Sequence, residues 1–160
     1  MRLVTALTPE ALPLIEHYRL KQVDSDPLFP LYRNDTIYLV VSGIGKTLAA
    51  AATAYLHTKS GELPNQPFLN IGIAGHHRSI AGAARVANRI TDQSTGQTWF
   101  PPQIIRDSME RSALITVETV ERDYAEDAAY DMEAAGFYPI AWRAPSAELV
   151  QSLKEISAHP

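Results

Sequence analysis

The chain has 160 residues, of which 46% are hydrophobic and 20% charged, the balance of a globular protein large enough to bury a core. It contains no cysteine, which excludes disulfides, thiolate catalysis and cysteine-based zinc sites. The formal net charge of -4 argues against a nucleic-acid partner. No run of about 18 apolar residues is present and the N-terminus lacks a signal-peptide core, so we expect no membrane partner and a cytoplasmic location.

Strand-like and helix-like segments alternate along most of the chain. An apolar run at 3–7 leads into a helix, with Thr8 as the N-cap, Pro9 as the first helical residue and Glu10 as an acid in the first turn. Further strands are expected at 37–41, 68–75, 84–91 and 113–119, and further helices at 46–58, within 130–138 and at 146–156.

The last of these helices is predicted from its apolar spacing. Leu149, Val150, Leu153 and Ile156 recur at helical intervals, and Ser146 is a suitable N-cap before them. The complete pattern predicts one α/β domain over residues 1–160 with a largely parallel sheet. Ligands of such sheets bind outside the carboxyl ends of the strands, where the loops after Leu7, Ser42 and Ile73 are expected to meet.

The stretch VVSGIGKT at 40–47 resembles a nucleotide-binding loop, but its spacing excludes one. A P-loop needs a glycine five residues before its Gly-Lys-Ser/Thr, and Val40 stands there. The dinucleotide pattern also fails, because Leu48 stands where its third glycine belongs. The two glycines instead permit a tight turn from strand to helix, and the alanines that follow let the helix lie close to the sheet.

Three stretches in order, SGIGKTLAAAA at 42–52, NIGIAG at 70–75 and YDMEAAGFY at 130–138, resemble the nucleoside phosphorylase superfamily. The opening MRLVTALTPEA also resembles its 5′-methylthioadenosine/S-adenosylhomocysteine nucleosidase branch, whereas residues 76–129 match loosely. The resemblance implies a three-layer α/β/α fold, shortened at its C-terminus, that forms homo-oligomers. It also implies cleavage of the N-glycosidic bond of a purine nucleoside, with an adenosine modified at its 5′ position as one candidate and with no metal or cofactor.

The resemblance assigns roles to several residues. Glu133 would bind the ribose hydroxyls and stabilise the oxocarbenium-like transition state, with Met132 lining the sugar. Glu10 would orient the attacking water, and Ile73, Ala74 and Gly75 would line the base and sugar pocket. For both glutamates the alternative is an acid at a helix start, where the helix dipole favours it. Asp131 is expected to cap the same helix as Glu133.

The loop that holds Glu10 lacks the phosphate-binding arginine of the phosphorylases. This favours hydrolysis over phosphorolysis, unless Arg78 or Arg85 reaches the site. The adjacent His76 and His77 make a poor metal pair, since they project in different directions; surface exposure is the expectation for them, with a hydrogen bond to substrate as the alternative. Tyr124, Trp99 and Phe100 are candidates to stack on a base, against core or interface packing.

One expected residue is missing. The family carries a late aspartate that helps to protonate the leaving base, and the chain has Ala147 or Ala158 in its place, depending on the alignment. Asp92 or Asp127 could replace it. The loss of a general acid typically lowers a rate by about 10²–10⁴-fold. The chain is therefore an altered nucleosidase, a truncated or redesigned one, or a protein that binds nucleosides without turnover; an assembly subunit with no small-molecule role is the further alternative.

Overall fold

The computed structural model describes residues 1–23, 28–76, 78–104 and 108–158. Its elements in chain order are β1 (Arg2–Thr5), α1 (Thr8–Tyr18), β2 (Lys21–Gln22), β3 (Leu31–Arg33), β4 (Tyr38–Val41), α2 (Lys46–Ser60), β5 (Phe68–Gly75), β6 (Ala84–Asp92), β7 (Thr98–Trp99), β8 (Glu110–Thr116), β9 (Ala129–Asp131), α3 (Ala134–Ala141), the 3-10 turn η1 (Ala147–Leu149) and β10 (Val150–Ala158). Among the described residues, no helix combines the length and apolar character needed to cross a bilayer.

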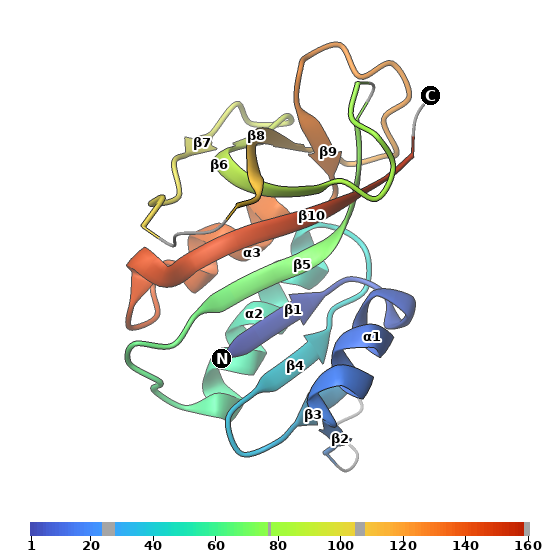
Figure 1. The fold of residues 1–160 in the computed structure, drawn as a ribbon. Helices are drawn as coiled ribbons and strands as arrows, with labels where there is room; N and C mark the ends of the chain where they lie inside the picture. The colour runs from blue at the N-terminus through green and yellow to red at the C-terminus, as the bar shows by residue number, and fades with distance from the viewer. Residues whose placement is uncertain (24–27, 77, 105–107, 159–160) are drawn as a thin grey trace.

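The strands form a mixed sheet whose central pairings are parallel. β1 lies between β4 and β5, parallel to both, and β10 runs parallel to β5 on the far side. From β10 the sheet continues through β6, β8 and β9, and β9 pairs with β5 again, so these five strands close into a ring. α1 lies on one face and α2 and α3 lie on the other (Figure 1). The three-layer α/β fold with a mixed sheet is confirmed.

Two apolar clusters hold the layers together. The larger lies between the sheet and α2 and α3, where the rings of Phe68 and Phe137 meet edge to face at 5.4 Å. The smaller lies under α1, where Ala11 packs against strand residues such as Leu3 and Leu39. Burial of this apolar surface on both faces is the main driving force for the fold.

The helix predicted at 146–156 is wrong. Only Ala147–Leu149 form a short 3-10 turn, and Val150–Ala158 are the strand β10 between β5 and β6. Apolar side chains at this spacing fit a buried strand as well as a helix, and pairing on both edges decides for the strand. Ser146 is the N-cap of the short η1 only; its φ is 63°, in the left-handed region, and its side chain makes no capping hydrogen bond.

The start of α1 also differs from expectation. Leu7 is the N-cap and Thr8 is already helical, one residue earlier than predicted. No side-chain hydrogen bond from the cap stabilises this end. The carboxylate of Glu10 instead accepts the backbone N–H groups of Ala6 and Leu7, so it fastens the turn in place of Thr8.

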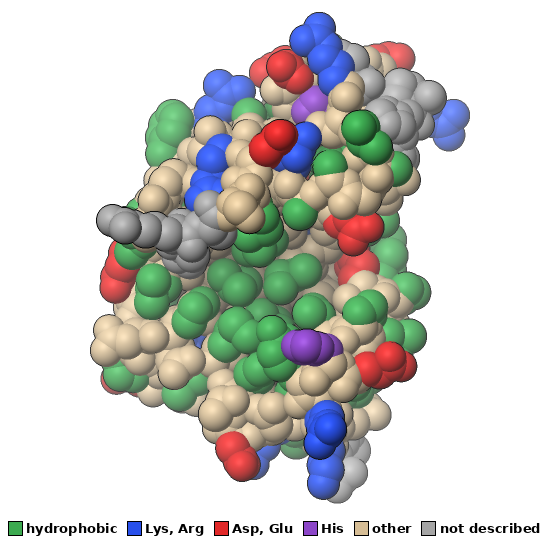
Figure 2. Space-filling model, viewed as in Figure 1, with side chains coloured by type: hydrophobic (Ala, Val, Ile, Leu, Met, Phe, Trp, Pro, Cys, Tyr) green, Lys and Arg blue, Asp and Glu red, His purple; other side chains and the backbone are tan. Residues whose placement is uncertain are grey.

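Part of the sheet face beside α1 presents apolar side chains to the surface. Figure 2 shows hydrophobic side chains gathered over the middle of this face, where β5 and β10 run past α1. The residues that line its hollows include Leu69, Ile71, Ile73 and Leu153. The homo-oligomer implied by the family resemblance stays a prediction.

Gly136 of α3 lies against the backbone at the start of α2. A Cβ at this position would lie 2.7 Å from the carbonyl carbon of Lys46, which is backbone and cannot turn aside. We expect Gly136→Ala to destabilise the protein by about 1–3 kcal/mol through overpacking. Helix propensity alone predicts the opposite sign, a gain of about 1 kcal/mol. Urea unfolding measures the change, and a variant as stable as the parent would contradict the close packing.

Candidate active site

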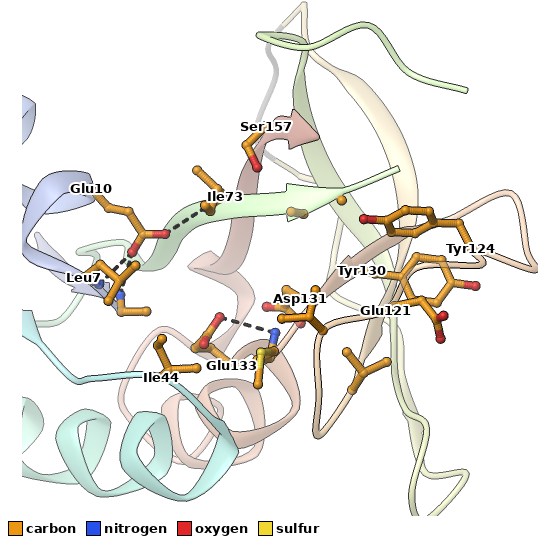
Figure 3. Close-up of a pocket in the computed structure, with 16 residues that line it drawn as sticks. Leu7, Glu10, Ile44, Ile73, Glu121, Tyr124, Tyr130, Asp131, Glu133 and Ser157 are labelled. Carbon is orange, nitrogen blue, oxygen red and sulfur yellow. Dashed lines mark hydrogen bonds between the residues drawn. The ribbon is translucent and has the colours of Figure 1, made fainter. Parts of the chain in front are cut away.

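A pocket of about 240 Å³ opens at the carboxyl ends of β1, β4 and β5. Its lining comes from the loop after β1, the turn before α2, the end of β5, the segment between β8 and β9 and the turn between β9 and α3 (Figure 3). Leu7, Ile44 and Ile73 all line it. The prediction that the three loops meet at this edge is therefore confirmed.

The residues predicted for the site lie together in this pocket. The lining includes every one of them: Glu10, Ile73, Ala74, Gly75, Met132 and Glu133. They come from three separate segments, and the fold brings Glu10 and Glu133 into one cavity although 123 positions separate them in the sequence. Their chemical roles stay predictions.

Glu133 is a buried carboxylate at the start of α3. Its Oε1 accepts the backbone N–H of Gly45 at 3.1 Å, and its Oε2 accepts that of Met132 at 3.3 Å. Burial raises the pKa of this carboxyl above its ordinary value. The glycine turn of the VVSGIGKT stretch therefore holds the Glu133 carboxylate at the pocket through the N–H of Gly45.

Glu10 joins two strands at the same pocket. Its Oε2 accepts the N–H groups of Ala6 and Leu7 at 2.9 and 2.8 Å, and its Oε1 accepts the N–H of Ile73 at 3.0 Å. Gly72 leaves the necessary space, because a Cβ there would lie 2.9 Å from Oε1. Glu10 is thus both an acid at a helix start and a pocket carboxylate, so the two readings of the sequence are compatible.

Lys154 of β10 lies next to the pocket and contacts two of its lining carboxylates, which the sequence did not predict. Its side chain is 3% exposed, and its Nζ lies 2.8 Å from Asp131 Oδ2 and 3.9 Å from Glu133 Oε2. Burial alone would lower its pKa, but the carboxylates of Asp131 and Glu133 outweigh burial and raise the pKa. Side chains two positions apart in a strand lie on the same face, so a strand would place Lys154 on the face of the buried Ile156. The helix predicted at 146–156 has a different period and did not indicate this.

Asp131 joins four elements around this lysine. Its Oδ2 accepts the N–H of Ala134, the first residue of α3, at 2.9 Å, although the N-cap position itself is Glu133. Its Oδ1 accepts the hydroxyl of Thr116 at 2.7 Å, and Thr116 in turn accepts the N–H of Ala135. β8, β9, α3 and β10 therefore share one buried polar network, and its cation is Lys154.

Two alanines stand where one or the other alignment places the late aspartate of the family, and they lie at opposite ends of β10. Ala147 belongs to η1, before the strand begins and next to the end of β5 that is remote from the pocket. Ala158 pairs with Gly75, which lines the pocket. The geometry thus favours the alignment in which position 158 corresponds to the late aspartate.

Neither alternative acid lies in the pocket lining. Asp92 forms an ion pair with Lys46 at 2.8 Å; burial opposes the charge of Asp92, but the hydrogen bonds from Lys46 and Ser94 lower its pKa to about 2. Asp127 faces His76 and Arg78, each at 3.7 Å. Lys46 is thus a helix-start residue bound to carboxylates, and not a phosphate ligand.

The structure shows the environment of one of the two adjacent histidines. His76 is 5% exposed, so the expectation of surface exposure is wrong for it. Its Nδ1 accepts the backbone N–H groups of Arg78 and Ser79, which fasten the turn after β5. His77 lies outside the described residues.

Solved structures of nucleosidases share this fold. A 5′-methylthioadenosine/S-adenosylhomocysteine nucleosidase from Colwellia psychrerythraea 34H, in complex with adenine, is 18% identical, with a TM-score of 0.77 over 99% of this chain and 81% of that one. The nucleosidase of Neisseria meningitidis, in complex with methylthio-immucillin-A, is 18% identical, with a TM-score of 0.75 over 97% and 84%. A futalosine hydrolase mutant of Helicobacter pylori strain 26695 is 14% identical, with a TM-score of 0.76 over 98% and 88%.

No family model matches the chain, and no curated protein matches it in sequence. At identities of 14–18% the likeness to these structures establishes a common fold.

Proposed function

We propose that this chain, which has the fold of the nucleosidases of the nucleoside phosphorylase superfamily, hydrolyses the N-glycosidic bond of a purine nucleoside. The observation that carries the proposal is the meeting of Glu10, Met132 and Glu133 in one pocket at the carboxyl ends of the strands. The adenine and methylthio-immucillin-A bound to two structures of this fold support the substrate class. A cytoplasmic location and a substituted 5′ position of the nucleoside stay predictions.

The proposed reaction uses the two carboxylates in different ways. As the bond from C1′ to the base nitrogen breaks, its electron pair leaves with the base and positive charge develops on the ribose. Glu133 accepts hydrogen bonds from the ribose hydroxyls, fixes the ring and stabilises that positive charge. A water held by Glu10 adds to C1′, and the proton that the water loses passes to the carboxylate.

The charge of the pocket lining favours water over phosphate as the nucleophile. Within the described part of the chain, the residues that line the pocket include Glu10, Glu121 and Glu133 and no arginine or lysine. Arg85 is engaged with Ser79 and Glu110, and Arg78 faces Asp127, so neither provides the missing cation. The buried Lys154 next to the pocket is already paired with Asp131 at 2.8 Å, so a phosphate dianion would meet like charges without an unpaired cation among these residues.

The test is base release from a panel of purine nucleosides, with and without phosphate. We expect release from at least one substrate without phosphate, and a fall of about 10²–10⁴-fold in kcat for Glu10→Gln, because the amide cannot take the proton of the water. Glu16→Gln, an exposed acid on the same helix, is the control and should leave the rate unchanged.

Since Glu10 also fastens its loop, the melting temperature and KM of the variant are measured beside kcat. If the Glu10→Gln variant folds, binds substrate and turns it over like the parent, Glu10 does not act as the base. If the parent protein releases no base from any nucleoside, the proposed function is wrong.

The second candidate is a nucleoside-binding protein without turnover, which the alanine at position 158 favours. A ligand bound only by the folded state stabilises it by about 2.7 kcal/mol at 100 times its Kd. Stabilisation by nucleosides with no base release would establish this candidate, and base release would exclude it.

A further inference from the structure

Tyr124 forms part of the pocket wall opposite the buried carboxylates. The residue is 7% exposed, and its ring meets the ring of Tyr130 edge to face, with centroids 5.3 Å apart. Figure 3 shows the Tyr124 hydroxyl directed toward the cavity and the Tyr130 hydroxyl directed away from it. The Tyr130 hydroxyl accepts the N–H of Glu126, whereas no hydrogen bond joins the Tyr124 hydroxyl to any described residue.

The Tyr124 hydroxyl lies directly over Gly75. A Cβ on Gly75 would collide with the phenol, at 2.6 Å from its Cζ, so only a glycine permits this placement. Gly75 pairs with Ala158 of β10, the position that the pocket geometry favours for the late acid of the family. The phenol thus stands over the strand pair from which that acid would act on the base.

The backbone of Tyr124 is held in an unusual conformation. Its φ is 40°, in the left-handed region that non-glycine residues rarely adopt. The preceding turn is fastened by Glu121, whose Oε1 accepts the N–H groups of Arg122 and Asp123. Strain of this kind in a pocket wall points to a constrained side-chain position.

The other two aromatic candidates lie elsewhere. Trp99 packs toward Tyr138, with ring centroids 6.4 Å apart, and Phe100 is 71% exposed. Neither lines the pocket with Tyr124. Of the three, only Tyr124 can touch a base held in this cavity.

We propose that the Tyr124 hydroxyl donates a hydrogen bond to an acceptor nitrogen of the departing purine and so replaces the carboxyl group that is absent at position 158. The proposal rests on the proposed function. As the C1′–N bond breaks, its electron pair moves into the base, and the ring nitrogens gain negative charge. A phenolic O–H aimed at one of them stabilises that charge without a change in the protonation of the enzyme.

The test compares two leaving groups in Tyr124→Phe. We expect kcat/KM for purine nucleosides to fall by about 10²–10³-fold, the usual loss for one donor to a developing anion. Hydrolysis of 4-nitrophenyl ribofuranoside should stay nearly unchanged, because nitrophenolate is a stable anion that needs no donor. Tyr32→Phe, on β3 away from the pocket, is the matched control and should change neither rate.

The outcomes separate this proposal from the proposed function. An equal fall for both substrates, or no fall for either, overturns the role of Tyr124 while hydrolysis stands. If the parent protein hydrolyses nothing, the proposed function fails, and calorimetry with adenine still decides the hydrogen bond. An affinity lower by about fivefold in Tyr124→Phe would support it, and equal affinity or no binding to the parent would overturn it.

Discussion

Lys154→Met is expected to lower the free energy of unfolding by about 3–5 kcal/mol, because it leaves the Asp131 carboxylate buried without its cation. The Asp131 side chain has no exposed surface, and the ion pair spans 2.8 Å. For a chain of this size the loss corresponds to a fall of roughly 6–20 °C in the melting temperature. Thermal and urea unfolding measure it.

Two variants make the result specific. Lys21→Met removes an exposed lysine on β2 and should leave stability nearly unchanged. Adding Asp131→Asn to Lys154→Met removes both charges, so the double variant should regain part of the loss in a double-mutant cycle. A Lys154→Met protein as stable as the Lys21→Met protein would show that the buried pair is not a major contributor.

Glu133→Gln is expected to lower kcat/KM for base release by about 10²–10³-fold, the usual effect of removing one electrostatic contact to a transition state. The amide still has an oxygen to accept the N–H of Gly45, whereas the negative charge that the proposed function directs at the ribose is lost. Single-turnover measurements of base release check the change. Glu148→Gln, on an exposed side chain of η1, is the control.

The pH dependence gives an independent readout for the same residue. Burial raises the pKa of Glu133, so the ionised form is lost at a higher pH than for an exposed glutamate. The acid limb of kcat/KM should therefore lie above the ordinary glutamate value of about 4.3. Glu133→Gln should lose the contribution of this group to the limb, whereas the contribution of the Glu10 base remains. Equal rates and an unchanged acid limb would assign the carboxylate a purely structural role.

Much of the site is predictable from the sequence because it depends on local features of the chain. The turn with Gly43 and Gly45, the strand at 68–75 and the helix at 46–58 follow from glycine placement and hydrophobic spacing within single segments. The carboxyl ends of the predicted strands place Glu10 and Ile73 at one edge of the sheet. The family resemblance adds Glu133 and Met132, and the pocket contains all four residues.

The features that the sequence does not predict depend on contacts between distant segments. β10 is a strand because β5 and β6 pair with its two edges, and its apolar spacing alone fits a helix as well. Lys154 is buried and charged because Asp131 and Glu133 lie beside it. Tyr124 stands over Gly75 although 49 positions separate the two residues in the sequence. The spacing of residues within one segment does not indicate such partners. Burial and ion pairing arise only when distant segments come together in the folded chain.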